Sequence, residues 1–234
     1  MRVAFFGCTG ATGVFILPQL LSLGYDVSVL VRDKKKLGDL TNNSSLYITE
    51  GSPRDENTVR TVINGSDIVL STLGNAGYGS ESDGLMYASI KNIVSGMRDS
   101  KVKKLVLMEG IFVGQPTDSY TAQTLFKPFL YFYSPWRDAM NLSNFVNSDD
   151  VKNSIDWIII RPPFLTNEII DDKDVPTRYT HYRDCLRLAV TYKVSRQCVA
   201  HFLVEIVKQA SGRDIGDFDI WSTYKHFAPT IVQN

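Results

Sequence analysis

The sequence predicts an α/β fold in which a parallel sheet is covered by helices. Three observations support this prediction. Over the first 161 residues, short β-rich runs alternate with longer amphipathic stretches, which is typical of parallel strands joined by helices. A glycine-rich turn follows the first apolar run, at residues 7–13. A second buried run, Ile68–Ser71, leads into a glycine turn at Gly74, and such turns mark the carboxyl edge of a sheet, where ligands bind.

The strands are predicted from these short β-rich runs and the turns that bound them. The runs are Val3–Phe6, Val27–Val31, Leu46–Thr49, Ile68–Ser71, Lys104–Met108 and Trp157–Ile160. Each connection between a strand and a helix is short, which keeps consecutive elements adjacent in space.

The helices fall between the strands. The first is predicted at Gly13–Leu23, where Gly24 would cap its C-terminus. Its apolar stripe consists of Val14, Leu17, Leu20 and Leu21. Two more amphipathic helices are predicted at Asp55–Ile63 and Ser82–Arg98.

The alternation stops after Ile160. Residues 161–234 are predicted to form a small appendage on the substrate side, and it begins with a loop at Arg161. The features that we expect in it are an acidic stretch at Glu168–Asp174, a helix at Ser195–Gln209 and a β-like run at Phe218–Trp221. No repeat, low-complexity tract or long linker separates this part from the rest. We therefore expect residues 1–234 to form a single domain.

The composition excludes several classes of partner. The 25 Lys and Arg residues balance the 25 Asp and Glu residues, whereas proteins that bind nucleic acids or anionic membranes carry an excess of cations. The longest apolar stretches are far shorter than the roughly 20 residues of a membrane-spanning helix. We expect no nucleic-acid or membrane partner, a small-molecule substrate, and a monomer or homodimer.

Cysteine usage and the N-terminus predict where the protein resides. The 3 cysteines are scattered without a Cys-x-x-Cys pair, which favours a reducing compartment. Met1 leads directly into an apolar strand, without the features of a secretory signal. We therefore expect a cytoplasmic protein. The histidines lack the spacing of metal ligands, so no metal site is predicted.

The glycine turn is the strongest functional signal. Glycines at these spacings, between a strand and a helix, allow a tight turn, a close approach of backbone N–H groups to a pyrophosphate, and close helix packing. The predicted cofactor-binding residues of this loop are Gly7, Thr9, Gly10, Ala11, Thr12 and Gly13. The alternative is an ordinary glycine-rich turn. Cys8 fills this turn as a small residue, or is a redox-sensitive thiol activated by the helix N-terminus.

The end of the second strand predicts which dinucleotide binds. The first polar residue there is Arg32, whose guanidinium can bind a 2′-phosphate through two parallel hydrogen bonds. Three consecutive lysines, the last of which is Lys36, follow closely. This local positive charge favours NADP(H) over NAD(H). Asp33 is the one acid here, and it faces solvent or caps the next helix. The alternative is a solvated basic turn without a ligand.

The chain resembles a family along its whole length: the atypical short-chain dehydrogenase/reductases that bind NADP, in particular the NmrA-like and biliverdin-IXβ (flavin) reductase group. The motifs that carry the resemblance are FGCTGATG at 6–13, GYDVSVLVRD at 24–33, EGSPRD at 50–55, DIVLSTLG at 67–74, KNIVSGM at 91–97, KKLVLMEGIF at 103–112, RPPFLT at 161–166 and KVSRQCVAHFLVEIV at 193–207. The resemblance implies a Rossmann-like, doubly wound sheet with NADPH as hydride donor. It also implies adenine contacts at Ser52 and Pro53, cofactor contacts at Leu73 and Gly74, and a nicotinamide site at Pro162 and Pro163.

The chain departs from this family at the catalytic residues. The usual Ser after the fifth strand is replaced by the stretch Met108-Glu109-Gly110, which has no hydroxyl. The usual Tyr-x-x-x-Lys is absent, and its nearest counterpart is Tyr133 with Arg137. An arginine is not equivalent to the lysine, because it is bulkier and never deprotonates. Tyr133 and Arg137 are therefore candidate catalytic residues, and the alternative is that Pro135 simply starts a helix.

Glu109 is the third catalytic candidate. It follows a central strand, beside the predicted nicotinamide site, which suggests a role in acid/base chemistry. The alternative is a hydrogen-bonded loop carboxylate.

Aromatic residues gather between Tyr120 and Trp136, where seven occur in 17 residues. This segment either forms an aromatic lid over a planar substrate or belongs to a dimer surface or a satellite core.

These observations predict an NADPH-dependent oxidoreductase that transfers hydride to a small planar acceptor, such as a flavin, a quinone or a tetrapyrrole-like compound. Reduction of such acceptors needs no strong protein acid, because the cofactor supplies the hydride. The missing Ser and Tyr-x-x-x-Lys favour an alternative: a non-catalytic NADP(H)-binding regulator or redox sensor of the NmrA type. An epimerase or dehydratase of nucleotide sugars is disfavoured, because the chain lacks a large C-terminal substrate domain.

Overall fold

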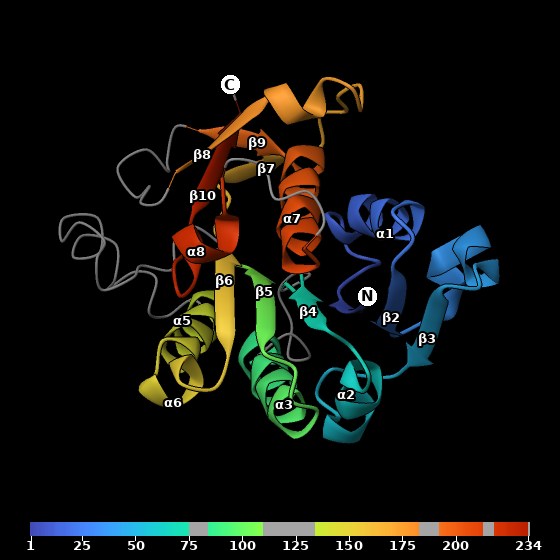
Figure 1. Ribbon diagram of the computed structural model, residues 1–234, viewed down its shortest axis with the longest axis vertical. Helices are drawn as coiled ribbons and strands as arrows, with labels where there is room; N and C mark the ends of the chain where they lie inside the picture. Colours follow the sequence, from blue (N-terminus) through green and yellow to red (C-terminus); the bar gives the residue numbers. More distant parts are fainter. Residues whose placement is uncertain (75–83, 110–133, 183–191, 213–217, 234) are drawn as a thin grey trace.

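The computed structural model describes residues 1–74, 84–109, 134–182, 192–212 and 218–233. A six-stranded parallel sheet in the order β3-β2-β1-β4-β5-β6 forms its centre (Figure 1). The strands are β1 (Arg2–Phe6), β2 (Asp26–Val31), β3 (Leu46–Glu50), β4 (Ile68–Ser71), β5 (Lys104–Met108) and β6 (Asp156–Ile160). All six predicted strands are confirmed, with ends within one residue. The strand order reverses between β1 and β4, so the fold is Rossmann-like and doubly wound.

Helices cover both faces of this sheet (Figure 1). One face packs against α1 (Gly13–Ser22) and α7 (Arg196–Ala210), and the other packs against α2 (Glu56–Ile63), α3 (Leu85–Asp99) and α5 (Ser134–Val146). Alternate residues of β1 enter the two cores: Phe5 faces the α1 and α7 side, and Phe6 faces the α2 and α3 side. None of the described helices is long and apolar enough to span a membrane.

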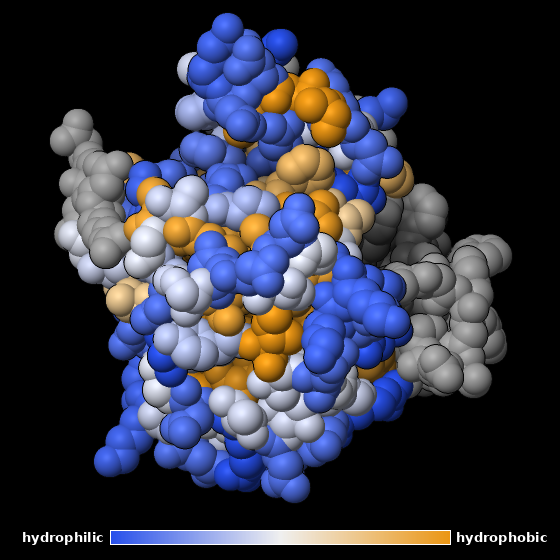
Figure 2. Space-filling view, turned by 90° about the vertical axis from the view of Figure 1, so that its right-hand side faces the viewer, coloured by the Kyte–Doolittle hydropathy of each residue, from blue (hydrophilic) through white to orange (hydrophobic). Residues whose placement is uncertain are grey.

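The start of α1 corrects one sequence prediction. Leu17 and Leu20 are buried as predicted, but Val14 is 49% exposed, and Ile16 takes its place in the core. Figure 2 views the side that carries α1 and β3, where apolar residues form a patch surrounded by polar residues.

The C-terminal end of α1 agrees with the prediction. Gly24 has a φ of +74° and donates its N–H to the Leu21 carbonyl, which confirms the predicted cap.

The region after Ile160 forms small sheets rather than a continuation of the main one. Strand β7 (Phe164–Thr166) pairs in parallel with β9 (Lys193–Ser195), and β8 (Tyr179–Tyr182) pairs antiparallel with β10 (Thr230–Gln233). The remaining short helices of the described chain are η1 (Lys34–Asn42), α6 (Asp149–Lys152), η2 (Val175–Thr177) and α8 (Ile220–Tyr224).

Two elements of this region test the sequence predictions. The helix predicted at Ser195–Gln209 is confirmed as α7, with Ser195 as its N-cap, because the Ser195 side chain accepts the Gln197 N–H. The β-like run predicted at Phe218–Trp221 is wrong. The Asp219 carboxylate accepts the Ser222 N–H at 3.0 Å and so starts α8. This local cap outweighs the β propensity of the aromatic residues around it.

Helix α3 has an unusual cap at its N-terminus. Its N-cap residue is Gly84, with a φ of +66° and no side chain to accept a hydrogen bond. Asp138, which belongs to α5, supplies the acceptors: its Oδ2 accepts the Met86 N–H at 2.8 Å, and its Oδ1 accepts the Tyr87 N–H at 2.9 Å. The carboxylate is only 3% exposed, so it joins α5 to the positive end of α3.

Replacing Asp138 should therefore destabilise the protein. We expect Asp138→Ala to lower the free energy of unfolding by about 3 kcal/mol, because two buried N–H groups lose charged acceptors. Asp138→Asn keeps one acceptor oxygen and should lose about half as much. Urea unfolding measures both values. The matched control is Asp150→Ala, whose carboxylate forms a surface pair with Arg98 and is 75% exposed; an equal loss in the control would contradict the capping role.

Candidate functional site

The carboxyl ends of the six parallel strands meet at one edge of the sheet. The residues that follow them are Gly7 after β1, Arg32 after β2, Gly51 after β3, Thr72 after β4, Glu109 after β5 and Arg161 after β6. The segments predicted to bind a cofactor therefore converge on this edge, around the point between β1 and β4 where the strand order reverses. In open α/β sheets, this point is where ligands bind.

The glycine loop has no room for a side chain at Gly7 or Gly13. Gly7 has a φ of +91°, and a Cβ there would lie 2.9 Å from the Thr72 backbone carbon. A Cβ on Gly13 would lie 2.1 Å from the Gly7 carbonyl oxygen, and one on Gly10 would lie 3.2 Å from the same oxygen. Glycine is thus required for the chain to turn and for α1 to approach β1.

The tip of the loop is open to a ligand. Gly10 and Ala11 are exposed, and Thr9 is half-buried. Thr12 is the N-cap of α1, but its buried side chain caps no backbone N–H. The Val14 and Phe15 N–H groups donate to the Gly10 and Thr12 carbonyls at 3.1 Å, and the N-terminal end of the α1 dipole adds positive potential at this tip. These features fit the pyrophosphate of a dinucleotide.

Cys8 is buried within this loop. Burial raises the pKa of its thiol to about 12, although hydrogen bonds from the Cys8 and Thr9 backbone act in the opposite direction. A thiol with such a pKa stays protonated and unreactive at neutral pH. The interpretation of Cys8 as a small residue that fills the turn is confirmed, and the redox-sensitive alternative is not supported.

Arg32 and Lys36 lie exposed after β2. The nearby acid, Asp33, is directed to the backbone: it is the N-cap of η1 and accepts the Lys35 N–H at 2.9 Å. Glu50 accepts the Lys34 N–H at 3.0 Å. Each carboxylate is thus engaged with the start of η1, which confirms the capping role considered for Asp33.

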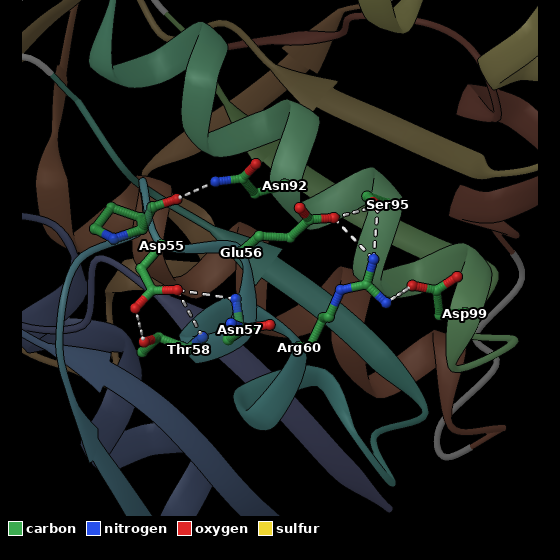
Figure 3. Close-up of polar contacts among 9 residues, drawn as sticks. Asp55, Glu56, Asn57, Thr58, Arg60, Asn92, Ser95 and Asp99 are labelled. Carbon is green, nitrogen blue, oxygen red and sulfur yellow. Dashed lines mark hydrogen bonds and ion pairs between the residues drawn. The ribbon is translucent and has the colours of Figure 1, made fainter.

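The turn after β3 is fixed by α3. The Ser52 hydroxyl accepts the Arg54 N–H at 3.2 Å. The Pro53 carbonyl accepts a hydrogen bond from Asn92 Nδ2 at 3.1 Å, and the Asn92 end of this bond is labelled in Figure 3. Asn92 could not be predicted as part of this turn, because nothing near it in the sequence indicates that its amide reaches a turn 39 residues away.

The same close-up shows why α2 and α3 stay together. Arg60 of α2 pairs with Glu56 on its own helix and with Asp99 of α3 (Figure 3). Ser95 of α3 donates to the Glu56 carboxylate at 2.9 Å. This network holds the helix that bears Asn92 in place beside the turn.

Glu109 lies in a buried ion pair. Arg161, which follows the neighbouring strand β6, donates from Nε at 2.9 Å and from Nη2 at 2.7 Å, both to Glu109 Oε2. Arg161 Nη2 also donates to the Ser143 hydroxyl of α5 at 2.9 Å. The Glu109 side chain is 0% exposed and that of Arg161 is 5% exposed. Glu109 is thus hydrogen-bonded, but to a cation that the sequence analysis did not place beside it.

The two carboxylate oxygens of Glu109 differ. Oε2 accepts both Arg161 bonds, whereas Oε1 is buried and has no hydrogen-bond partner among the described residues. Burial raises the pKa of Glu109 to about 7, even though Arg161 opposes this rise. Glu109 therefore holds or releases a proton near neutral pH.

The other predicted residues are placed as follows. Leu73 is half-buried and Gly74 is exposed after β4, while Pro162 and Pro163 are buried beside Arg161. Tyr133 and the aromatic segment up to it lie outside the described residues. Arg137 is exposed in α5, and Pro135 lies in the first turn of that helix, as the alternative predicted.

Comparison with solved structures supports the fold. A short-chain dehydrogenase/reductase from Veillonella parvula in complex with NADP has a TM-score of 0.72 at 12% identity, with 99% of this chain and 94% of that chain covered. A Rossmann-fold NAD(P)-binding family protein from Shigella flexneri has a TM-score of 0.66 at 19% identity, with 99% and 93% covered. An anaerobillin reductase from Escherichia coli has a TM-score of 0.66 at 16% identity, with 88% and 90% covered.

A family model identifies the chain more specifically than these distant structures do. Residues 7–210, most of the chain, match the model of a family described as NAD(P)H-binding. The match begins at the first glycine of the loop and extends through α7. The protein therefore belongs to this NAD(P)H-binding family.

Proposed function

We propose that the protein is an NADPH-dependent reductase that transfers a hydride to a small planar acceptor, such as a flavin, a quinone or a tetrapyrrole-like compound. One observation carries the proposal: the glycine loop and the buried carboxyl of Glu109 follow β1 and β5 at the same edge of the sheet. Bound there, the cofactor would supply the hydride. The chain would supply an anion site at the start of α1 and a titratable group near the reacting ring.

The strand order supports a site with an adenine end and a nicotinamide end. Relative to β1, the turns after β2 and β3 lie on one side and those after β4, β5 and β6 on the other. We propose adenine and 2′-phosphate contacts at Arg32, Lys36 and Ser52–Pro53, and nicotinamide contacts on the side of Leu73–Gly74 and Pro162–Pro163. Glu109 would lie near the nicotinamide, as would Tyr133 and Arg137 as further candidates.

The comparisons agree with this proposal in outline. The Veillonella parvula structure is described with NADP, and the Escherichia coli structure is described as a reductase. We propose that the chain belongs to the NmrA-like and biliverdin-IXβ reductase group, with residues 161–234 on the substrate side.

The alternative proposal is a non-catalytic NADP(H)-binding regulator. The observation that favours it is the stretch Met108-Glu109-Gly110, which has no hydroxyl where the short-chain dehydrogenase/reductases usually carry a catalytic Ser. An assay of NADPH oxidation with a panel of flavins and quinones separates the two functions. Turnover supports the reductase, whereas tight NADPH binding without turnover by any acceptor supports the regulator.

The choice of NADP(H) has its own test. We expect Arg32→Glu to weaken NADPH binding by about 100-fold, because a charge-assisted contact is replaced by repulsion, and to change NADH binding little. Fluorescence titration with each cofactor measures both affinities. Lys103→Glu is the matched control, since Lys103 precedes β5 at the opposite edge of the sheet. Equal losses for NADPH and NADH would contradict the assignment of Arg32 to the 2′-phosphate.

A further inference from the structure

Among the described residues, only one of the two carboxylate oxygens of Glu109, Oε2, has hydrogen-bond partners. A fully forked arginine–carboxylate pair uses both oxygens of the acid. Here Arg161 Nε and Nη2 both donate to Oε2, and Oε1 stays buried without a partner in the described part of the chain. Buried polar atoms are nearly always paired, so an orphaned oxygen calls for an explanation. One such explanation is that Oε1 forms its hydrogen bond with a bound substrate during the reaction.

Arg161 is itself firmly anchored. Its Nη2 donates to the Ser143 hydroxyl at 2.9 Å, and its backbone N–H donates to the Pro229 carbonyl at 3.0 Å. The hydroxyl of Thr230, at the start of β10, donates to the Arg161 carbonyl. The guanidinium is therefore held by Ser143 of α5, and the Arg161 backbone is held by the C-terminal segment. The guanidinium holds Oε2 in place and leaves Oε1 at a defined position.

We propose that Glu109 Oε1 donates a proton to the acceptor, and that Arg161, held by Ser143, is the positioning residue for this step. The inference rests on the proposed reductase function. The acceptor gains a hydride, with its two electrons, from the dihydronicotinamide, and a proton from Glu109. The Glu109 O–H bond breaks, its electron pair stays on the carboxylate beside Arg161, and water returns the proton after turnover.

The electrostatics of the pair suit this role. Burial favours the protonated carboxyl before the step, and Arg161 favours the carboxylate after it. The charged group that faces Glu109 among the described residues is Arg161 of the β6 side, and α5 contributes the neutral Ser143. Asp138, the acid on the buried side of α5, is bonded to the start of α3 instead. A proton donor works best when its pKa is close to the working pH.

The test follows the pH dependence of NADPH oxidation with menadione and with flavin mononucleotide as probes. We expect the wild-type kcat to fall as pH rises through about 7, because the donor loses its proton. Glu109→Gln should lower kcat by about 100-fold or more and abolish that pH dependence, with NADPH affinity unchanged. Arg161→Lys and Ser143→Ala should retain activity, and their pH dependence should move to higher pH because the carboxylate is less well stabilised.

Two control variants and one spectroscopic measurement complete the test. Glu205→Gln and Arg98→Lys change charged residues that are paired elsewhere, with Lys208 and with Asp150, and should leave the pH profile unaltered. Infrared spectra of the free protein should show a protonated carboxyl band that titrates near pH 7, is absent in Glu109→Gln, and titrates at higher pH in Ser143→Ala. Ser143→Ala keeps both charges, so it gives a result even where Glu109→Gln fails to fold.

The outcomes separate this inference from the function on which it rests. NADPH binding without turnover by the wild-type protein, with either probe, would overturn the reductase and the proton donor together. Turnover with the same pH profile in the wild type and in Glu109→Gln would overturn the proton donor alone. Variants that lose stability without any change in pH profile or in the carboxyl band would show that the pair only holds β5 to β6.

Discussion

Gly13→Ala is expected to abolish NADPH binding and to destabilise the protein by more than about 3 kcal/mol. The added Cβ would lie 2.1 Å from the Gly7 carbonyl oxygen and 2.8 Å from both the carbonyl carbon and the Cα of Cys8. All three atoms belong to the backbone, so no side chain can rotate away. Either α1 moves off β1 or the loop deforms, and both changes displace the N–H groups that we assign to the pyrophosphate. Urea unfolding with and without NADPH measures both losses.

Two other glycines serve as controls for this prediction. Gly24 has a φ of +74°, but a Cβ there meets nothing within 4 Å. Gly24→Ala should therefore destabilise by about 1 kcal/mol through backbone strain alone and leave NADPH binding intact. Gly10→Ala meets only the Gly7 oxygen, at 3.2 Å, and should fold with a smaller loss. NADPH binding by Gly13→Ala at wild-type affinity would show that this loop does not hold the cofactor.

Local sequence signals predicted the sheet well. Each strand of the main sheet is a short apolar run with turn residues on both sides, and both signals lie within a few residues of the strand. The glycine loop was recognisable for the same reason, since its strand, its turn and its helix are consecutive. The six strands of the main sheet and the glycine loop could therefore be located from neighbouring residues alone.

The corrections arise where a cap or tertiary packing decides. Val14 fits the apolar stripe of α1, but it lies next to the exposed loop tip, and about half of its surface stays exposed. The run at Phe218–Trp221 has strand-like composition, but Asp219 caps a helix there, and its Ile220 and Tyr224 enter the core one turn apart. Strand propensity depends strongly on context, so composition alone could not decide between the two.

The sequence predicted the position of Glu109 in the candidate site but not its partners. Glu109 could be placed at the end of a strand, but its partner is 52 residues away in the chain. The signal was present, because Arg161 directly follows the sixth predicted strand, and the ends of adjacent parallel strands lie side by side. Using it requires the strand order, which the periodicity of the sequence does not give. The same holds for Ser143, which reaches the pair from a helix.

The second large effect is a difference in stability between variants of the buried pair: replacing Glu109 should destabilise the protein more than replacing Arg161. Glu109→Leu leaves a guanidinium that cannot lose its charge, so we expect a loss of about 3–5 kcal/mol in unfolding free energy at about pH 7. Arg161→Met leaves a carboxyl that can take up a proton. Its loss should be clearly smaller at about pH 6, where the neutral acid is tolerated in the core.

The sign of the pH dependence follows from the raised pKa of Glu109. A carboxyl with a folded-state pKa of about 7, against an ordinary value of 4.5, contributes stability below pH 4.5 that is lost as pH rises through about 7. Removing Arg161 removes the group that opposes this rise, so in Arg161→Met the loss continues to higher pH. The destabilisation by Arg161→Met should therefore grow between about pH 6 and about pH 9. That by Glu109→Leu should instead fall by about 1 kcal/mol over the same range, because only the wild type loses the contribution of the protonated carboxyl.

The double variant completes the cycle and is measured by urea unfolding at both pH values. With Glu109→Leu and Arg161→Met together, no charge of the pair remains buried, so the total loss should be well below the sum of the single losses. The unfolding free energy of the double variant should also lack the pH dependence that Glu109 gives the wild type. Losses for Arg161→Met that are equal to those for Glu109→Leu at both pH values would contradict a carboxyl that accepts a proton near neutrality. Such a result would assign to Glu109 a permanent charge, and a permanently charged carboxylate has no proton to donate to an acceptor.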